Sequence, residues 1–147
     1  MTLNMTNITT HSTAIILAAG RGSRMKAKSK NKVAFKLSGQ PMITHTVGHL
    51  TDAGISNIIA VVGYQADSVR QALGDKVTYV TQIEQLGTGD AIKNAVSKLA
   101  IDTDVVLTVS GDDSAFYPPE LYQNMVKRIK ETGCDLLFLT IHKDDPT

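Results

Sequence analysis

The sequence has one cysteine and no long apolar run, so it lacks the usual features of disulfide-bonded and membrane-spanning proteins. Cys134 is the only cysteine among 147 residues, so no disulfide can form within the chain, and we expect a reducing, cytoplasmic setting. No apolar run approaches the roughly 20 residues that cross a bilayer. Residues 1–13 are rich in Thr and Asn and lack the basic start and apolar middle of a signal peptide. We therefore expect no membrane partner, and a flexible N-terminal arm over residues 1–13.

Aromatic residues are scarce and the charges nearly balance. Four tyrosines, three phenylalanines and no tryptophan leave few platforms on which bases could stack. The net charge of +1 gives no overall attraction to a polyanion. Seven basic residues nonetheless fall between Arg21 and Lys36, a segment without an acid. RNA binding is an alternative for this segment, but only Phe35 interleaves with its lysines, so we expect no nucleic-acid partner.

Short β-rich runs alternate with helical patterns along the chain. Strands are predicted at residues 14–19, 58–62, 77–81, 105–109 and 136–141, and helices at 41–54, 66–73, 87–100 and 119–132. This alternation predicts right-handed crossovers and a parallel sheet, and the apolar strands agree because such sheets are covered on both faces. We predict an α/β, doubly wound, mostly parallel, Rossmann-like sheet over residues 14–147. Ligands bind such sheets at the carboxyl ends of the strands.

A glycine-rich turn follows the first predicted strand, with the sequence Gly-Arg-Gly-Ser-Arg-Met over residues 20–25. Glycine permits positive φ and close approach of a ligand. Successive backbone N–H groups and arginine side chains suit phosphate oxygens. The GxxxxGK[ST] spacing is absent, and Met25 stands where a dinucleotide-binding turn has its third glycine. The turn therefore favours a nucleoside triphosphate; a tight turn with solvated arginines is the alternative.

A second turn, QIEQLGTGDA over residues 82–91, follows the third predicted strand. The amides of Gln82 and Gln85 suit the edge of a base, and Gly87 lets a ligand approach closely. Thr88 can cap the helix that follows, whose N-terminus attracts anions. An ordinary capped helix start is the alternative interpretation.

Asp112 and Asp113 come directly after the fourth predicted strand. Carboxylates at a strand end are good ligands for hard cations, and Mg²⁺ usually bridges one or two carboxylates to substrate phosphates. A solvated Asp-Asp turn is the alternative. The pair lies at the same sheet edge as the other two turns, which favours a magnesium-bound nucleotide.

Taken together, these stretches resemble the sugar-1-phosphate nucleotidyltransferase family, and most closely its N-acetylglucosamine-1-phosphate uridylyltransferase branch. The family's LAAGxGTRM is similar to residues 17–25, its Pro-Lys-Val to residues 31–33, its EQLGTGHA to residues 84–91, and its strand-end Gly-Asp to residues 111–112. The similarity covers residues 14–147.

The resemblance implies an Mg²⁺-dependent transferase that joins UTP to N-acetylglucosamine 1-phosphate and releases pyrophosphate. Arg24 and Lys32 would be the catalytic cations, and Asp112 would ligate Mg²⁺. The implied nucleotide-binding residues are Leu17, Ala18, Ala19, Gly20, Gly22, Ser23, Arg24, Lys32, Gln82, Gln85, Gly87, Thr88 and Gly111. Specificity for dTTP, GTP or CTP is an alternative, as is a nucleotide-binding module without turnover.

The sequence departs from the family pattern at several positions. Asn31 replaces proline and the loop is one residue longer, which makes Lys30 the alternative to Lys32. Residues 144–147 match a family stretch that continues into the sugar-binding part, so residues 14–147 are expected to be an incomplete, nucleotide-binding part. His45 and His49 have a metal-like spacing, but no third ligand is evident, and surface or packing roles are favoured.

Overall fold

A four-stranded parallel sheet forms the centre of the molecule, in the order β5–β4–β1–β6. The strands are β1 (Ser12–Ala18), β4 (Asn57–Val62), β5 (Thr78–Thr81) and β6 (Val105–Ser110). In register, Ile15 of β1 lies opposite Ile59 of β4 on one side and Thr108 of β6 on the other. The computed structural model describes residues 8–22, 29–140 and 142. The predicted parallel sheet is confirmed.

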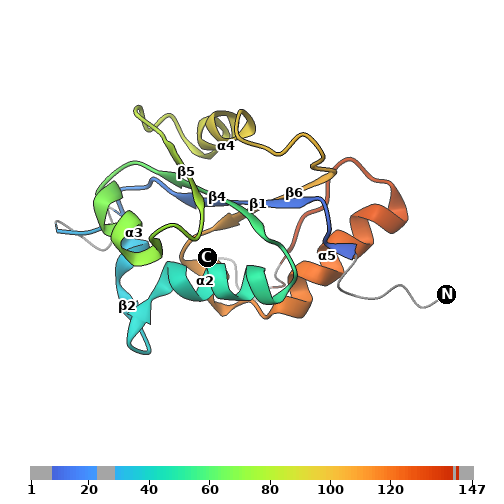
Figure 1. Ribbon diagram of the computed structural model, residues 1–147, viewed down its shortest axis with the longest axis horizontal. Helices are drawn as coiled ribbons and strands as arrows, with labels where there is room; N and C mark the ends of the chain where they lie inside the picture. Colours follow the sequence, from blue (N-terminus) through green and yellow to red (C-terminus); the bar gives the residue numbers. More distant parts are fainter. Residues whose placement is uncertain (1–7, 23–28, 141, 143–147) are drawn as a thin grey trace.

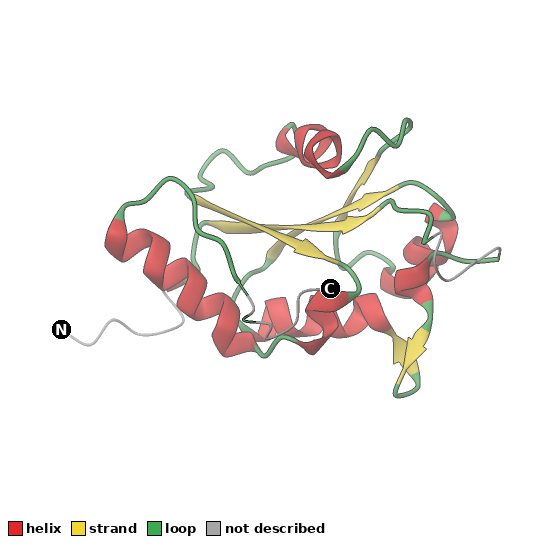
Figure 2. Cartoon of the chain, turned by 180° about the vertical axis from the view of Figure 1, so that it is seen from behind, coloured by secondary structure: helices red, strands yellow, loops and turns green. Residues whose placement is uncertain are grey.

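Helices cover both faces of this sheet (Figures 1 and 2). On one face lies α4 (Thr88–Val96), and on the other lie α2 (Met42–Asp52), α3 (Ala66–Leu73) and α5 (Pro119–Thr132). The predicted doubly wound architecture is therefore confirmed. Each strand ends at one edge of the sheet, where the three turns singled out in the sequence follow β1, β5 and β6.

The central strands β1 and β4 lack polar alternation because each faces two apolar layers. Successive side chains of a strand point to opposite faces. In β1, Ile16 belongs to the core cluster that includes residues of α2, α3 and α5, whereas Ile15 packs with Ala91 and Ala95 of α4. Both isoleucines are completely buried. Burial on both faces is what a near-continuous apolar strand requires.

Two glycines end helices where the sequence predicts that they should. Gly74 follows α3 with φ +57°, and Gly133 follows α5 with φ +63°, positive values that glycine adopts without a steric penalty. The bounds of α3 and α5 match the prediction. The helix predicted over residues 87–100 is shorter, because α4 ends at Val96 and turns follow it.

Several small elements between β1 and α2 were not predicted. They are the 3₁₀ helix η2 (Lys32–Ala34) and the antiparallel pair β2 (Lys36–Leu37) and β3 (Gln40–Pro41). A further 3₁₀ helix, η3 (Asp113–Phe116), follows β6. Two-residue strands and single helical turns leave too short a periodic pattern to be read from sequence.

The prediction of a fifth strand over residues 136–141 is wrong for the part that the structure describes. Residues 136–140 adopt no regular structure, and Leu136 and Phe138 are 67% and 75% exposed. An apolar run becomes a strand only where another strand accepts its backbone hydrogen bonds. Among the described strands β6 pairs only with β1, so residues 136–140 pass near its free edge without joining the sheet.

The prediction of an arm over residues 1–13 is wrong for residues 8–13, the part of it that the structure describes. Ser12 and Thr13 belong to β1, and Thr9 is buried. The ring nitrogen Nδ1 of His11 lies 2.7 Å from Oδ2 of Asp102. Residues 8–13 thus pack against the rest of the fold, while residues 1–7 lie outside the described residues.

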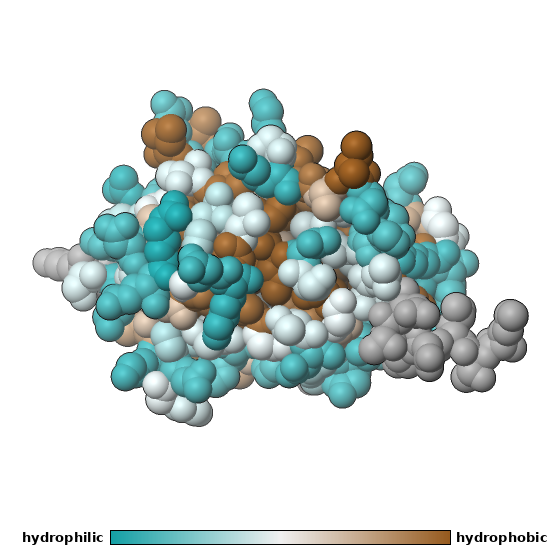
Figure 3. Space-filling view, viewed as in Figure 1, coloured by the Kyte–Doolittle hydropathy of each residue, from teal (hydrophilic) through white to brown (hydrophobic). Residues whose placement is uncertain are grey.

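The two edges of the sheet differ from its middle in exposure. Tyr79 and Val80 of the edge strand β5 are only half-buried. Figure 3 shows apolar atoms, in brown, at the surface between the layer of α4 and the layer of α2.

In the part of the chain described, no helix has the length and apolarity that crossing a membrane demands.

Candidate functional site

The carboxyl ends of β1, β4 and β5 approach one another closely at Gly63. A Cβ atom added to Gly63 would lie 3.0 Å from Cβ of Ala19 and 3.2 Å from the backbone oxygen of Gln82. The N–H of Tyr64 donates to the carbonyl of Ala19 at 3.1 Å. Glycine at position 63 therefore allows the segments after these three strands to form one continuous rim.

Three successive backbone carbonyls at the end of β1 each hold a different segment of this rim. The carbonyl of Leu17 accepts from the N–H of Gly111 at 3.1 Å. That of Ala18 accepts from the side-chain amide of Asn31 at 2.9 Å, and that of Ala19 accepts from the amide of Gln85 at 3.1 Å. We call residues 17–19 the β1 hub. The main chain of the β1 hub thus joins the acidic turn (Asp112 and Asp113), the basic segment (residues 21–36) and the amide turn (residues 82–91).

The acidic turn meets the basic segment through a direct ion pair. Nζ of Lys32 lies 2.5 Å from Oδ2 of Asp112, and the hydroxyl of Ser110 donates to Oδ1 of Asp112 at 2.5 Å. Burial raises the pKa of Asp112, but the hydrogen bonds from Lys32 and Ser110 outweigh it, and the pKa lies below its ordinary value. The carboxylate is therefore ionised over the physiological range.

Gly111 sets the distance between these two elements. A Cβ atom at this position would lie 3.0 Å from Cγ1 of Val33 and 3.3 Å from Cγ2 of Ile16. Val33 belongs to η2 and is completely buried. Only glycine lets the backbone after β6 approach η2 so closely, and this approach places Asp112 beside Lys32.

The glycine turn is described only as far as Gly22. Gly22 has φ +58°, and its added Cβ would lie 3.1 Å from Cβ of Lys32, so the turn and Lys32 are in contact. Nε of Arg21 donates to Oε1 of Gln85 at 3.2 Å. The glycine turn therefore touches both Lys32 and the amide turn. Ser23 and Arg24 lie outside the described residues, and their proposed roles stay predictions.

Asn31 is a residue whose importance sequence reasoning missed. It is 1% exposed, and its Nδ2 lies 2.9 Å from the carbonyl of Ala18, 3.2 Å from that of Gly20 and 2.8 Å from that of Tyr64. Its Oδ1 accepts from the N–H of Val33. One buried amide thus ties the end of β1, the glycine turn and the segment after β4 to the start of η2. Lys30, the alternative to Lys32, lies over the ring of Phe35 at 5.5 Å and not on Asp112.

The amide turn begins at Gln82, which is 4% exposed. Its Nε2 donates to the carbonyl of Gly87 at 3.1 Å and to Oδ2 of Asp90 at 2.7 Å. Gly87 has φ +104° and occupies the N-cap position of α4. Thr88 is the first residue of the helix, so the expected capping by its side chain is wrong; no side-chain hydrogen bond caps α4.

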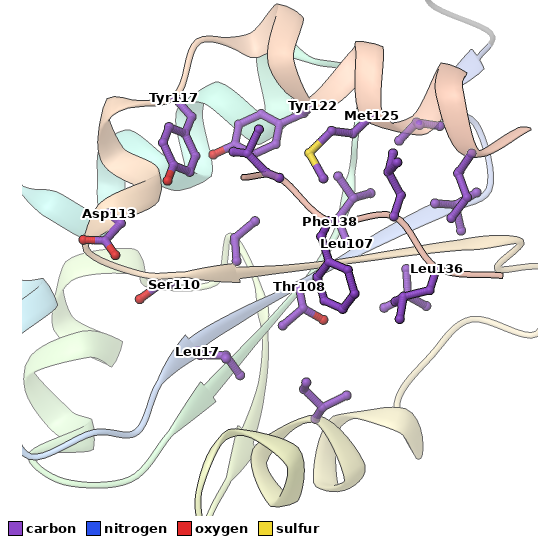
Figure 4. A pocket seen from close by; sticks show the side chains of 18 of the residues that line it. Leu17, Leu107, Thr108, Ser110, Asp113, Tyr117, Tyr122, Met125, Leu136 and Phe138 are labelled. Atoms are coloured by element: carbon purple, nitrogen blue, oxygen red, sulfur yellow. The ribbon is translucent and has the colours of Figure 1, made fainter. Parts of the chain in front are cut away.

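A cavity of about 520 Å³ opens beside the rim, between β6, α4 and α5 (Figure 4). Leu17, Ser110 and Asp113 lie toward one end of it, and Leu136 and Phe138 lie toward the other. Thr88 also contributes to its lining. Its walls are mostly apolar, and Asp113, at the end nearest the rim, is the one charged residue among the described residues that line it.

No ready-made metal cage is present in the described residues, where no three His, Cys, Asp or Glu side chains come together. Asp112 is the partly exposed carboxylate at the rim, and Asp113 next to it begins η3. Nε2 of His45 lies 2.9 Å from the carbonyl of Leu37, a packing role in line with the interpretation favoured from the sequence.

Residues 14–146 match the sequence profile of the MobA-like NTP transferase domain. The chain belongs to this family. Curated relatives of this NTP transferase domain include the bifunctional protein GlmU of Exiguobacterium sibiricum, 41% identical over 134 residues, and that of Heliobacterium modesticaldum, 44% identical over 134 residues. Each alignment covers 91% of this chain and 29% of the relative. The NTP transferase domain described here thus spans under a third of the length of these relatives.

Solved structures also resemble the NTP transferase domain. A UDP-glucose pyrophosphorylase from Acinetobacter baumanii superposes with a TM-score of 0.69 at 20% identity, over 83% of this chain and 53% of that one. A nucleotidyl transferase from Methanothermobacter thermautotroptrophicus gives a TM-score of 0.64 at 24% identity, over 79% and 56% of the two chains. These similarities confirm the Rossmann-like fold, and the sequence relatives confirm the family resemblance found in the motifs.

Proposed function

We propose that this NTP transferase domain binds UTP and transfers its uridylyl group to a sugar 1-phosphate, with N-acetylglucosamine 1-phosphate as the favoured acceptor. The observation that carries the proposal is the contact between Lys32 and Asp112, 2.5 Å apart. It joins a cation beside the glycine turn to a carboxylate at a strand end. A triphosphate on the glycine turn would meet both groups, as its phosphates and an accompanying cation require.

In the proposed reaction, a phosphate oxygen of the sugar 1-phosphate attacks the α-phosphorus of UTP. A new P–O bond forms, the bond between the α- and β-phosphates breaks, and pyrophosphate leaves with the electron pair. The attacking oxygen is already an anion, so no side chain has to remove a proton. The domain's own contribution is alignment and charge neutralisation, for which Lys32 and the predicted Arg24 are suited.

Asp112 is the residue that would hold Mg²⁺. A single carboxylate fits the way this ion binds, since water and substrate phosphates supply its remaining ligands. Asp112 is ionised and partly exposed at the rim. When bound, Mg²⁺ would neutralise charge on the triphosphate. Lys32 now holds one oxygen of this carboxylate, and a bound triphosphate would offer Lys32 a second anion.

Support for a uridylyl donor comes from two sources. The GlmU relatives are 41% and 44% identical, and the EQLGTG stretch of the amide turn is shared with the uridylyl branch of the resemblance. Transfer from dTTP, GTP or CTP is the alternative within the same chemistry. A domain that binds a nucleotide without turnover is the alternative outside it.

One pair of measurements separates these possibilities. Isothermal titration calorimetry with UTP, CTP, GTP and dTTP in the presence of Mg²⁺ measures binding and base preference. A coupled assay measures pyrophosphate release after N-acetylglucosamine 1-phosphate is added. UTP binding with pyrophosphate release supports the proposal. UTP binding without release would favour the binding module, and preferential binding of another nucleotide would reassign the donor.

A further inference from the structure

The side-chain amide of Gln82 is held in one orientation by two hydrogen bonds to the start of α4. Nε2 of Gln82 donates to the carbonyl of Gly87 and to Oδ2 of Asp90, at 3.1 Å and 2.7 Å. A carbonyl and an ionised carboxylate can only accept, so the nitrogen must face them. A primary amide has two N–H groups, and these two acceptors use both.

Asp90 is itself fixed in the first turn of α4. The side-chain amide of Asn94 donates to Oδ2 of Asp90 at 3.1 Å and to its backbone carbonyl at 2.9 Å. The acceptor that orients Gln82 is therefore tethered one helical turn further along. Rotation of the Gln82 amide by 180° would bring its oxygen against this carboxylate, which two acceptors cannot tolerate.

The oxygen of the same amide is left available. Gln82 is 96% buried. Its Oε1 has no hydrogen-bond partner among the described residues, but this oxygen keeps some access to solvent. The other amide of the turn is in a different state. Gln85 donates to Ala19 and accepts from Arg21, so both of its ends are engaged within the domain.

We propose that Asp90 is a positioning residue that fixes Gln82 as a hydrogen-bond acceptor and so selects the base of the nucleotide. The inference rests on the proposed nucleotide site. An acceptor-only amide pairs with a ring N–H on the Watson–Crick edge, which uracil, thymine and guanine carry. Cytosine and adenine present an unprotonated ring nitrogen there, and two acceptors would then face each other.

The expected size of this selection follows from the cost of an unmade hydrogen bond in a buried place. Leaving Oε1 unpaired against a second acceptor should weaken CTP relative to UTP by about 10- to 100-fold. The same amide cannot separate uracil from thymine, because both carry the ring N–H at the same place. Discrimination between those two must come from other contacts.

The test is a competition experiment on the 147-residue chain with Mg²⁺, in which UTP and CTP displace a fluorescent UTP analogue. In the unmodified chain we expect UTP to bind about 10- to 100-fold more tightly than CTP. In Asp90→Ala only the carbonyl of Gly87 still accepts from the amide of Gln82, so the amide turns over more readily and the ratio should fall to about threefold or less, mainly because CTP binds more tightly. Asp90→Asn keeps an acceptor oxygen for Nε2, so it should restore most of the ratio.

A matched control is available in α3. Asp67 lies in the first turn of α3, as Asp90 lies in the first turn of α4. Asp67→Ala removes an acid from the first turn of a helix without touching Gln82, and the UTP:CTP ratio should not change. If circular dichroism shows that Asp90→Ala does not fold, Asp90→Ser replaces it. The serine side chain is too short to accept from Nε2 of Gln82, and the change in polarity is smaller.

The outcomes distinguish this inference from the proposed function. An Asp90→Ala chain that binds UTP with an unchanged UTP:CTP ratio would overturn the role of Asp90 and leave the nucleotide site standing. Tighter binding of CTP than UTP by the unmodified chain would overturn the acceptor assignment of Gln82. If no nucleoside triphosphate displaces the analogue or binds at millimolar concentration, the proposed function fails and this inference fails with it.

Discussion

Nζ of Lys32 and Oδ2 of Asp112 lie 2.5 Å apart although 80 residues of sequence separate them. The glycine at position 111 and the 3₁₀ turn that carries Lys32 bring them together. In this pair the ammonium group of Lys32 and the carboxylate of Asp112 neutralise each other in the absence of a ligand. A phosphate would compete for Lys32, and a metal ion would compete for the carboxylate.

Substitution of Asp112 tests whether this carboxylate binds the metal ion. Asp112→Ala should lower pyrophosphate release by about 10³-fold or more, while UTP binding persists in part because the glycine turn and Lys32 remain. The dependence of UTP affinity on Mg²⁺ should also disappear, as a magnesium titration followed by calorimetry would reveal. Asp75→Asn, at an exposed acid remote from the rim, serves as the control. Turnover equal to that of the unmodified chain would remove Asp112 from the metal role.

Asn31 provides a test of stability. Asn31→Ala removes an amide that contacts three backbone carbonyls, and it should lower the free energy of unfolding by about 2 kcal/mol. Asn31→Asp should cost more, because a carboxylate oxygen would face those carbonyls in place of the donor. Urea denaturation gives both values. An Asp variant as stable as the Ala variant would contradict the donor role of Nδ2.

The close approach at Gly111 can be tested with one methyl group. Gly111→Ala places a Cβ 3.0 Å from Val33 Cγ1, and it should destabilise the fold by about 1–3 kcal/mol and weaken UTP binding by moving Asp112 away from Lys32. Gly48→Ala is the control: it lies in α2, and nothing lies within 4 Å of its added Cβ. That variant should be stabilised by up to about 1 kcal/mol. Equal melting temperatures for the two variants would argue against the close approach.

Tyr122 gives a prediction about alkaline pH. Burial raises the pKa of Tyr122 to about 12, while its hydroxyl donates to the carbonyl of Ser114 at 3.1 Å. The raised pKa means that the folded state favours the neutral phenol. This contribution is fully present below pH 10, the ordinary pKa, and is lost as pH rises from 10 toward 12, at roughly 1.4 kcal/mol per unit.

Tyr122→Phe isolates this effect. The variant lacks the ionisable hydroxyl, so its free energy of unfolding should fall less steeply than that of the unmodified chain between pH 9.5 and 11.5. Tyr79, whose pKa burial also raises, is present in both chains and cancels in the comparison. Denaturation curves at a series of pH values would show the difference, and parallel pH profiles would contradict it.

The four-stranded sheet is predicted well because each of its strands carries its own signal. β1 and β4 are apolar on both faces, and glycines mark the ends of α3 and α5. The run at residues 136–141 carries the same signal, but whether it pairs depends on a neighbour and not on its own residues. Local pattern therefore cannot distinguish a strand from an apolar segment beside an open sheet edge.

The site was predictable to the extent that its residues carry chemistry. Lys32 was identified from the family resemblance, and Asp112 from its place at a strand end and from the same resemblance; the structure brings the two into contact. The role of Asn31 and the orientation of Gln82 were not predictable, because they depend on carbonyls and a carboxylate supplied by folding. A family departure at Asn31, where a donor replaces proline, was the one available signal. The roles of Ser23 and Arg24 stay predictions.

The β1 hub has a consequence for how the domain tolerates change. The three carbonyls of Leu17, Ala18 and Ala19 accept these hydrogen bonds through the main chain. Conservative side-chain replacement at these positions therefore leaves the three acceptors intact. Insertion or deletion of one residue would shift all three anchors by one position. All three turns would then lose the hydrogen bonds that position them, although every ligand-facing side chain would still be present.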